Sequence, residues 1–299
     1  MTLPPFLAKF MQDAPPAYAF ELSEAGVAWA LRHGDIQFRE FEPGMIAVSP
    51  ARDNVLMPEA FTARIRQLVD GANQRAKRRP AAVILPDHSA RVQVLDFDSF
   101  PTDAEDQVAL IKFRVKKSVP FDIDSATVSY HVQPAAQAKK KVEVVAALMS
   151  LEIVARYEAP FRAAGLSPGF VTTSALAALN LMPATGLNIL TKLSGNILSV
   201  LAVDGSRLKL VRTVELESIA SEEILAVLHP TLAFLEDEMH SKVDKVLLCG
   251  FGHDTVQFAV ECEAELNVPV EALQSRRGAP GPFNAGLIGY LESPGGGVV

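Results

Sequence analysis

The chain has 299 residues, a length that suits two domains or four subdomains. Hydrophobic residues make up 49% of it and charged residues 21%, which is typical of a globular protein with a large core and excludes a disordered chain. The net charge of −7 argues against a surface built to bind nucleic acid. The two cysteines, Cys249 and Cys262, lack a C-x-x-C spacing, so we expect no disulfide framework and a reducing, cytosolic setting.

Residues 1–17 form an N-terminal extension. Apolar residues at helical spacing predict a short helix that ends at Ala14-Pro15-Pro16. This helix docks on a membrane surface or a partner in one interpretation and packs on its own domain in the other; the single Lys9 is little basic charge for a membrane anchor. No apolar run is long enough to span a bilayer, and no secretion signal is recognisable.

Two stretches, 18–41 and 187–216, share the order strand, turn, strand, turn, strand. In the second stretch, Ile197 to Val203 is almost wholly apolar, as in a strand covered on both faces, and Asp204-Gly205 is a hairpin signal. Helices follow each meander. The sequence therefore predicts an α/β protein with two equivalent lobes, the duplicated, ribonuclease H-like arrangement of the actin-like fold. In that fold, a nucleotide lies between the lobes and is held by the first turn of each meander.

The elements between the meanders predict a subdomain inserted in the first lobe. A helix opens at Pro58 and ends in the basic run Arg75 to Arg79, which complements the helix dipole, and Ala81 to Leu85 is a buried strand. The predicted division is an N-terminal extension (1–17), a first lobe (18–87 and 151–186), an inserted subdomain (88–150), a second lobe (187–292) and a disordered tail (293–299).

Two helices show clear sequence signals. In the insertion, Thr102 is the predicted N-cap, with Glu105 three residues later in a capping-box spacing. In the second lobe, Ser218 starts a helical segment that Pro230 kinks or splits.

Three segments resemble the PilM family, the actin-like cytoplasmic components of type IV pilus assembly, and less closely the cytoplasmic part of GspL from type II secretion. They are VPFDID (119–124) followed by VSYHV, the strand and helix at 141–168, and VLLCGFG (246–252). The resemblance covers roughly residues 18–292. It implies the actin-like fold and a groove, in the first lobe and insertion, that binds the cytoplasmic tail of a membrane protein, PilN.

The first phosphate loop of the family reads approximately Asp-Ile-Gly-Ser-Ser-Ser-x-Lys after the first strand. Here Glu21 keeps a carboxylate at the Asp position, but Ser23 replaces the glycine that lets backbone approach a phosphate. Glu24 places a negative charge where the phosphate would lie, and Ala28 removes the lysine. Each change opposes anion binding, which depends on bare N–H groups and positive charge.

The second phosphate loop should read Asp-x-Gly, but no carboxylate lies between Asn188 and Val203, so a magnesium-binding Asp is missing. Lys192 in this run is either a phosphate contact or, more commonly, a solvated turn lysine. Gly250-Phe251-Gly252 is expected either to face the adenosine of a nucleotide or to form a tight turn between a strand and a helix. The candidate residues of this degenerate ATP site are Glu21, Ser23, Lys192, Gly250 and Gly252. We expect no cofactor, with ATP and magnesium as the alternative.

We therefore expect a cytoplasmic scaffold, not an enzyme, peripherally associated with a bacterial inner membrane. Its implied partner is the tail of a PilN-like single-span protein, and through it other pilus inner-membrane components and motor ATPases. Phe121 and Ile123 are candidate partner contacts by location, with core packing as the alternative. An extended tail can also dock by adding a strand to an exposed edge.

Three rival functions stay open. The first is an active ATP-binding actin-like protein of the PilM or FtsA type, and the second is a GspL-like adaptor, which normally continues into a membrane helix. A sugar-kinase-type enzyme would need a catalytic Asp near the cleft, and none stands at an expected turn. The six histidines show no metal-binding spacing, and Asp122 and Asp124 are read as turn caps rather than paired acids.

Overall fold

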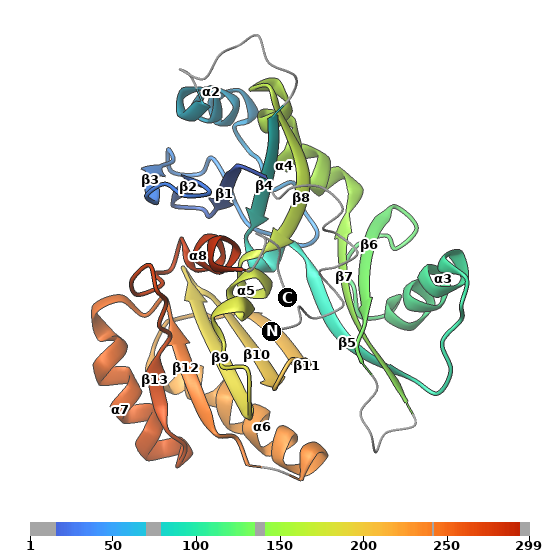
Figure 1. The fold of residues 1–299 in the computed structure, drawn as a ribbon, viewed down its shortest axis with the longest axis vertical. Coiled ribbons are helices and arrows are strands. Elements are labelled where there is room, and N and C mark those ends of the chain that lie inside the picture. Colours follow the sequence, from blue (N-terminus) through green and yellow to red (C-terminus); the bar gives the residue numbers. More distant parts are fainter. Residues whose placement is uncertain (1–15, 70–78, 135–140, 241, 294–299) are drawn as a thin grey trace.

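The computed structural model describes residues 16–69, 79–134, 141–240 and 242–293. Figure 1 shows two five-stranded sheets, one per lobe, and a three-stranded sheet beside them. The predicted N-terminal helix, residues 294–299 of the tail and residues 75–78 of the basic run lie outside the described residues. Ser293, predicted as the first residue of the disordered tail, is instead buried, and its N–H donates to the Gly289 carbonyl at 3.1 Å. Arg79 itself begins a strand instead of ending a helix, and its guanidinium carbon lies 4.8 Å from the Tyr18 ring centre.

The first lobe contains the predicted meander. Its strand order is β3-β2-β1-β4-β8, with the first three antiparallel and β1, β4 and β8 parallel. Helices α2 and α4 pack on one face of the sheet, while α5 and α8 pack on the other. The elements are β1 (Tyr18–Leu22), β2 (Gly26–Leu31), β3 (Gln37–Glu40), α2 (Pro58–Val69), β4 (Arg79–Leu85), α4 (Leu151–Ala163), β8 (Leu166–Thr173), α5 (Ser174–Ala178) and α8 (Ala285–Glu292).

The insertion is an antiparallel sheet of order β5-β7-β6 covered by α3. The N-cap of α3 is Asp103 and not Thr102, because the Asp103 carboxylate accepts hydrogen bonds from the backbone N–H groups of Glu105 and Asp106. The elements are β5 (Arg91–Phe97), α3 (Ala104–Val115), β6 (Ala126–Val132) and β7 (Val142–Ser150). A 3₁₀ turn, η1 (Asp87–Ser89), connects β4 to this subdomain.

The second lobe repeats the first, with strand order β11-β10-β9-β12-β13. Pro230 was predicted to kink or split a helix, and it does not split it: α6 runs unbroken from Ser221 to Met239, because apolar residues on both sides of the proline pack in the lobe core. It begins after Ser218, whose backbone N–H donates to the Glu223 carboxylate. The elements are β9 (Leu187–Ser194), β10 (Ile197–Asp204), β11 (Arg207–Glu215), α6 (Ser221–Met239), β12 (Lys245–Cys249), α7 (Thr255–Leu266) and β13 (Val270–Ala272).

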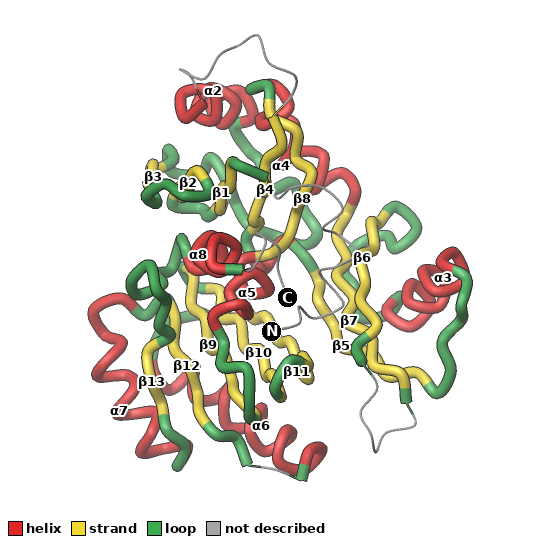
Figure 2. The backbone as a smooth tube through the Cα atoms, in the orientation of Figure 1, coloured by secondary structure: helices red, strands yellow, loops and turns green. Residues whose placement is uncertain are grey.

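The matching strand orders confirm the predicted duplicated, two-lobed α/β fold. Figure 2 shows α5 and α8 between the two large sheets. Residues of α5 pack against strands of both lobes, and α8, which the sequence assigned to the second lobe, also packs on β1. The centre of the molecule is therefore the place where both lobes contribute side chains.

Candidate functional site

Lys192 lies in β9 and is buried between the lobes, so its interpretation as a solvated turn lysine is wrong. Its Nζ donates to Asp87 Oδ2 at 2.9 Å, and the two side chains are 2% and 5% exposed. The Ser199 hydroxyl donates to the same oxygen at 3.1 Å, and the backbone N–H of Ala175 donates to Asp87 Oδ1 at 2.6 Å. A buried ammonium is tolerated here because a hydrogen-bonded carboxylate faces it.

Glu21 belongs to the same cluster. Its Oε2 accepts from the backbone N–H of Leu287 at 2.7 Å, and its Oε1 accepts from the Ser174 hydroxyl. Burial raises the pKa of Glu21 above its usual range, against the opposing charge of Lys192. Burial also acts to lower the pKa of Lys192, but Asp87 and Glu21 outweigh it and raise that pKa, so the ammonium stays charged. The Glu21 carboxylate is thus bonded inside the protein.

The first meander turn is closed by its own hydrogen bonds. The Ser23 hydroxyl donates to the Gly26 carbonyl at 3.0 Å, and the Gly26 N–H donates back to Ser23 Oγ at 3.1 Å. The Glu24 carboxylate accepts from the Val48 N–H at 2.6 Å and so ties the turn to the following loop. The Gly26 N–H, which could otherwise face an anion, already has a partner.

The glycines after β12 have separate roles. Gly250 has a φ of +88°, and a Cβ there would lie 2.0 Å from the Leu193 carbonyl oxygen, so glycine is required by the close approach of β9. Gly252 has a φ of +61° with open space beside it. Of the two, only Gly252 leaves room for another molecule.

A cavity of about 570 Å³ opens between the β2–β3 hairpin and the loop before α8. It is bordered by Ala28 but by none of the five residues predicted for the ATP site. Arg277 at its rim donates to the carbonyls of Gly34 at 3.2 Å and Arg32 at 3.3 Å. The predicted site residues and the open cavity therefore do not coincide.

A smaller pocket of about 100 Å³, here called the insertion groove, lies between the first lobe and the insertion. Phe121 lines it and is half-buried, whereas Ile123 is 4% exposed and packs in the core of the insertion. Only Phe121 of the two predicted partner contacts presents surface to another molecule. The groove residues are Ala51, Arg52, Asp53, Phe121, Ser150, Glu152, Ile153 and Arg156.

Asn54, which sequence reasoning missed, fixes the loop on one wall of the groove. It is fully buried, and its Nδ2 donates to the carbonyls of Ser49 at 2.6 Å and Arg52 at 2.7 Å. Its Oδ1 accepts from the hydroxyls of Tyr157 and Ser89, both at 2.9 Å. An Asn among Pro, Arg and Asp looks like an ordinary turn residue, so nothing local in the sequence distinguishes it.

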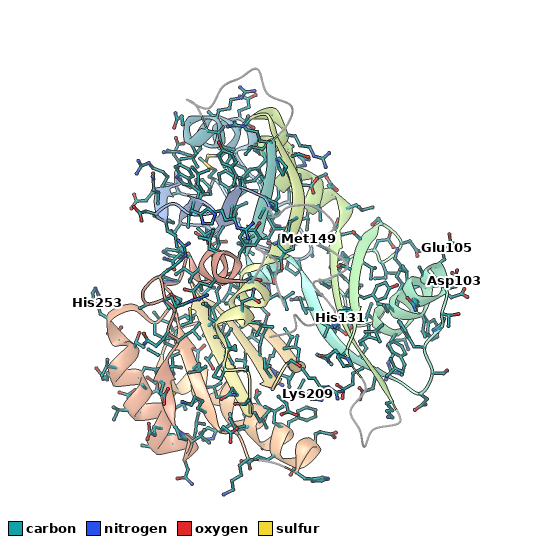
Figure 3. The ribbon with its side chains drawn as sticks, viewed as in Figure 1. Asp103, Glu105, His131, Met149, Lys209 and His253 are labelled. Carbon is teal, nitrogen blue, oxygen red and sulfur yellow. The ribbon has the colours of Figure 1, made fainter. Side chains whose placement is uncertain are left out.

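The insertion is also tied to the second lobe. Glu143 is buried and accepts hydrogen bonds from Arg207 and Lys209 of β11. Gln133 exchanges two hydrogen bonds with the backbone of Leu208, each 2.8 Å long. Figure 3 shows Lys209 on the side of the second lobe that faces the insertion. Burial opposes ionisation of Glu143, but its two cationic partners prevail and lower its pKa.

Other chemistry is limited. Within the described ranges, no group of three or more His, Cys, Asp or Glu side chains is arranged to hold a metal ion. Burial raises the pKa of the Cys249 thiol to about 12, which makes it a poor nucleophile. Asp122 accepts from the Asp124 N–H at 3.2 Å, so its interpretation as a turn cap is confirmed. Among the helices described, none combines the length and apolar character needed to cross a bilayer.

No protein-family model matches the sequence, and no curated protein matches it. The structure is similar to a chain of the PilM-PilN type IV pilus biogenesis complex, with a TM-score of 0.70, 17% identity, and 93% of this chain and 98% of that chain covered. It is also similar to a Bacteroides thetaiotaomicron protein with an actin-like ATPase fold and unknown function, with a TM-score of 0.52, 10% identity, and 90% and 94% coverage.

The cytoplasmic domain of EpsL, from the type II secretion system of Vibrio cholerae, matches with a TM-score of 0.46 and 10% identity, and the match covers 77% of this chain and 80% of that chain. At 17% and 10% identity, the first two similarities establish the fold of the chain. The chain has the actin-like fold.

Proposed function

We propose that the protein is a non-enzymatic scaffold of bacterial type IV pilus assembly, at the cytoplasmic face of the inner membrane. One observation carries the proposal: the centre between the lobes holds a buried Lys192–Asp87 pair of the protein itself. The fold shared with a chain of the PilM-PilN complex over 93% of this chain supports the link to the pilus. In this role the ATP site is degenerate, and the protein works by docking other proteins.

The partner is the cytoplasmic tail of a PilN-like membrane protein, and the insertion groove is its docking site. Phe121 supplies an apolar contact, while Arg52, Glu152 and Arg156 can fix the orientation of a tail. Strand β6 begins five residues after Phe121 and is an edge strand of its sheet, so an extended tail can continue along it. The fixed loop around Asn54 limits the ordering cost of binding.

A direct binding experiment tests this role. A fluorescent peptide of the tail of a PilN-like protein from the same genome is titrated with the full chain, and anisotropy is recorded. Phe121→Ala should weaken binding about tenfold or more, since an aromatic anchor contributes on the order of 1–2 kcal/mol or more. Phe113→Ala is the matched control, because Phe113 is 80% exposed on α3 and outside the groove. Equal affinity for the wild type and Phe121→Ala would place the tail elsewhere.

A working ATP binder is the second candidate, favoured by the cavity of about 570 Å³ beside Ala28. Millimolar ATP with magnesium would then raise the melting temperature, because a ligand selective for the folded state stabilises it. The scaffold proposal expects no shift. A GspL-like adaptor is distinguished by the peptide titration when it is repeated with the tail of a type II secretion membrane protein.

A further inference from the structure

The central ion cluster joins residues of opposite lobes. Lys192 and Ser199 come from β9 and β10 of the second lobe, while Asp87 follows β4 of the first. Glu21 in β1 lies close enough to act on the same ammonium. In the actin-like arrangement a bound ligand bridges the two lobes at their centre. We propose that Lys192 is a built-in cation that holds the lobes closed without any bound ligand.

The bonding of Asp87 explains why the pair resists opening. One of its oxygens accepts from Ala175 of the first lobe and the other from two second-lobe groups, Lys192 and Ser199. Separating the lobes breaks both second-lobe bonds at once and leaves a charge on each side that must find water. An unpaired charge is costly in a site this buried, so the pair favours the closed state.

A second buried contact acts in the same direction. Glu143 of the insertion is held by Arg207 and Lys209, and Gln133 by the backbone of Leu208, all on β11. The second lobe is thus tied both to the core of the first lobe and to its insertion. A rotation between the lobes has to break two buried ionic contacts and not one.

Closure of this kind changes how the protein can be regulated. A ligand moves an equilibrium between two states only by its difference in affinity for them. If the protein's own lysine already selects the closed state, a nucleotide has no change in lobe position to drive. This inference shares the buried Lys192–Asp87 pair with the proposed function but concerns the lobes and not the partner, so a failure of tail docking leaves it untouched.

Distance measurements between spin labels test closure. Labels at Glu59→Cys on α2 and Glu222→Cys on α6, both exposed helical positions, report the separation of the lobes. The native Cys249 and Cys262 are buried and do not compete for the label. The wild type should give one narrow distance distribution, unchanged by millimolar ATP with magnesium. Lys192→Met should give a broader distribution with a longer mean distance.

Two further variants make the result decisive. Lys245→Met is the matched control, because Lys245 also bonds a carboxylate at 2.9 Å, that of Glu271, but within one lobe and near the surface. It should leave the distances unchanged. If Lys192→Met does not fold, the double variant Asp87→Asn/Lys192→Met removes both charges at nearly constant volume and should fold with the broader distribution.

Either of two outcomes overturns the proposal. The first is a wild-type distribution in the folded Lys192→Met or double variant, which would mean that packing or the Glu143 contact, and not Lys192, closes the lobes. The second is a wild-type protein whose broad distribution narrows only with ATP and magnesium, which would mean that a ligand closes them. A failed peptide titration, by contrast, would affect only the proposed docking role.

Discussion

The central ion cluster and the insertion groove use similar charged residues in opposite ways. In the cluster, Lys192 and Asp87 lie 2.9 Å apart with 2% and 5% exposure. In the groove, Arg156 lies 3.6 Å from Asp53, and the two side chains are 45% and 37% exposed. Burial makes the first pair part of the fold, because neither charge has water as an alternative partner. The groove charges are half in water and can exchange their partner for another molecule.

This difference separates structure from recognition within one molecule. Breaking a buried pair leaves a charge with no compensation, whereas an exposed pair contributes little and is screened by salt. We therefore expect the cluster to govern stability and the groove to govern binding.

Asp87→Ala should lower the free energy of unfolding by about 3–5 kcal/mol, because it leaves Lys192 buried without a counter-charge. The matched change Asp53→Asn removes the charge that faces Arg156 but keeps an oxygen for the Val55 N–H, and it should cost less than about 1 kcal/mol. Urea denaturation of both variants checks the contrast. Equal losses would show that burial does not separate the two pairs.

Glu143→Ala should cost about 3 kcal/mol, since Arg207 and Lys209 then lose their buried carboxylate. The same contact predicts a pH dependence. The pKa of Glu143 is lower in the folded protein, so its contribution is complete above the unfolded value near 4.3 and is lost as the pH falls through the folded value. When the free energy of unfolding is measured against pH, Glu143→Gln should lose less stability in acid than the wild type does. The same pH dependence in the variant and the wild type would mean that the Glu143 charge does not help to hold the insertion on the second lobe.

Asn54→Ala should cost about 1–3 kcal/mol, because the carbonyls of Ser49 and Arg52 lose the Asn54 amide and the buried hydroxyls of Ser89 and Tyr157 each lose one of their partners. It should also weaken binding of the tail peptide, since the loop at Arg52 and Asp53 is no longer held in place. Denaturation and anisotropy on the same sample measure both effects. A stability loss with unchanged affinity would mean that the loop's order does not matter to the groove.

The elements that the sequence predicted well are those with a local pattern. Alternating and continuous apolar runs identified both meanders, and the lobes follow from their repetition. Strand β8 (Leu166–Thr173) has no such clear pattern, because Pro168 and Gly169 interrupt it, which is tolerated at the edge of a sheet. Thr102 was predicted as the N-cap of α3 instead of its neighbour Asp103. Both residue types suit that position, and only the backbone geometry shows that Asp103 occupies it.

For the candidate site, the sequence predicted only which phosphate-binding and magnesium-binding residues of the family are missing. The missing glycine at Ser23 and the missing carboxylates around Lys192 could be read directly from the sequence. What replaced them could not be read, because Asp87 is 105 residues from Lys192 and sits in a turn that looks ordinary. The hydrogen bonds of Asn54 could not be predicted for the same reason, since Asn54 and Tyr157 are 103 residues apart in the sequence. Long-range pairing of polar residues leaves no periodic signal.

The smallest predicted effect is a loss of stability just below neutral pH. It tests whether His88, the neighbour of Asp87 in the sequence, affects the central cluster. His88 follows Asp87 and is buried, and its Nδ1 finds no hydrogen-bond partner among the described residues. Burial, reinforced by Arg91, lowers the pKa of His88 against the opposing charges of Glu215 and Asp87. The folded protein therefore binds this proton less readily than the unfolded chain, and stability falls as the pH drops below about 6.5. His88→Asn should reduce the fall in melting temperature between neutral and mildly acidic pH, but not abolish it, because burial also lowers the pKa of His131. A variant that follows the wild-type pH curve would mean that His88 can take up a proton without disturbing the cluster beside it.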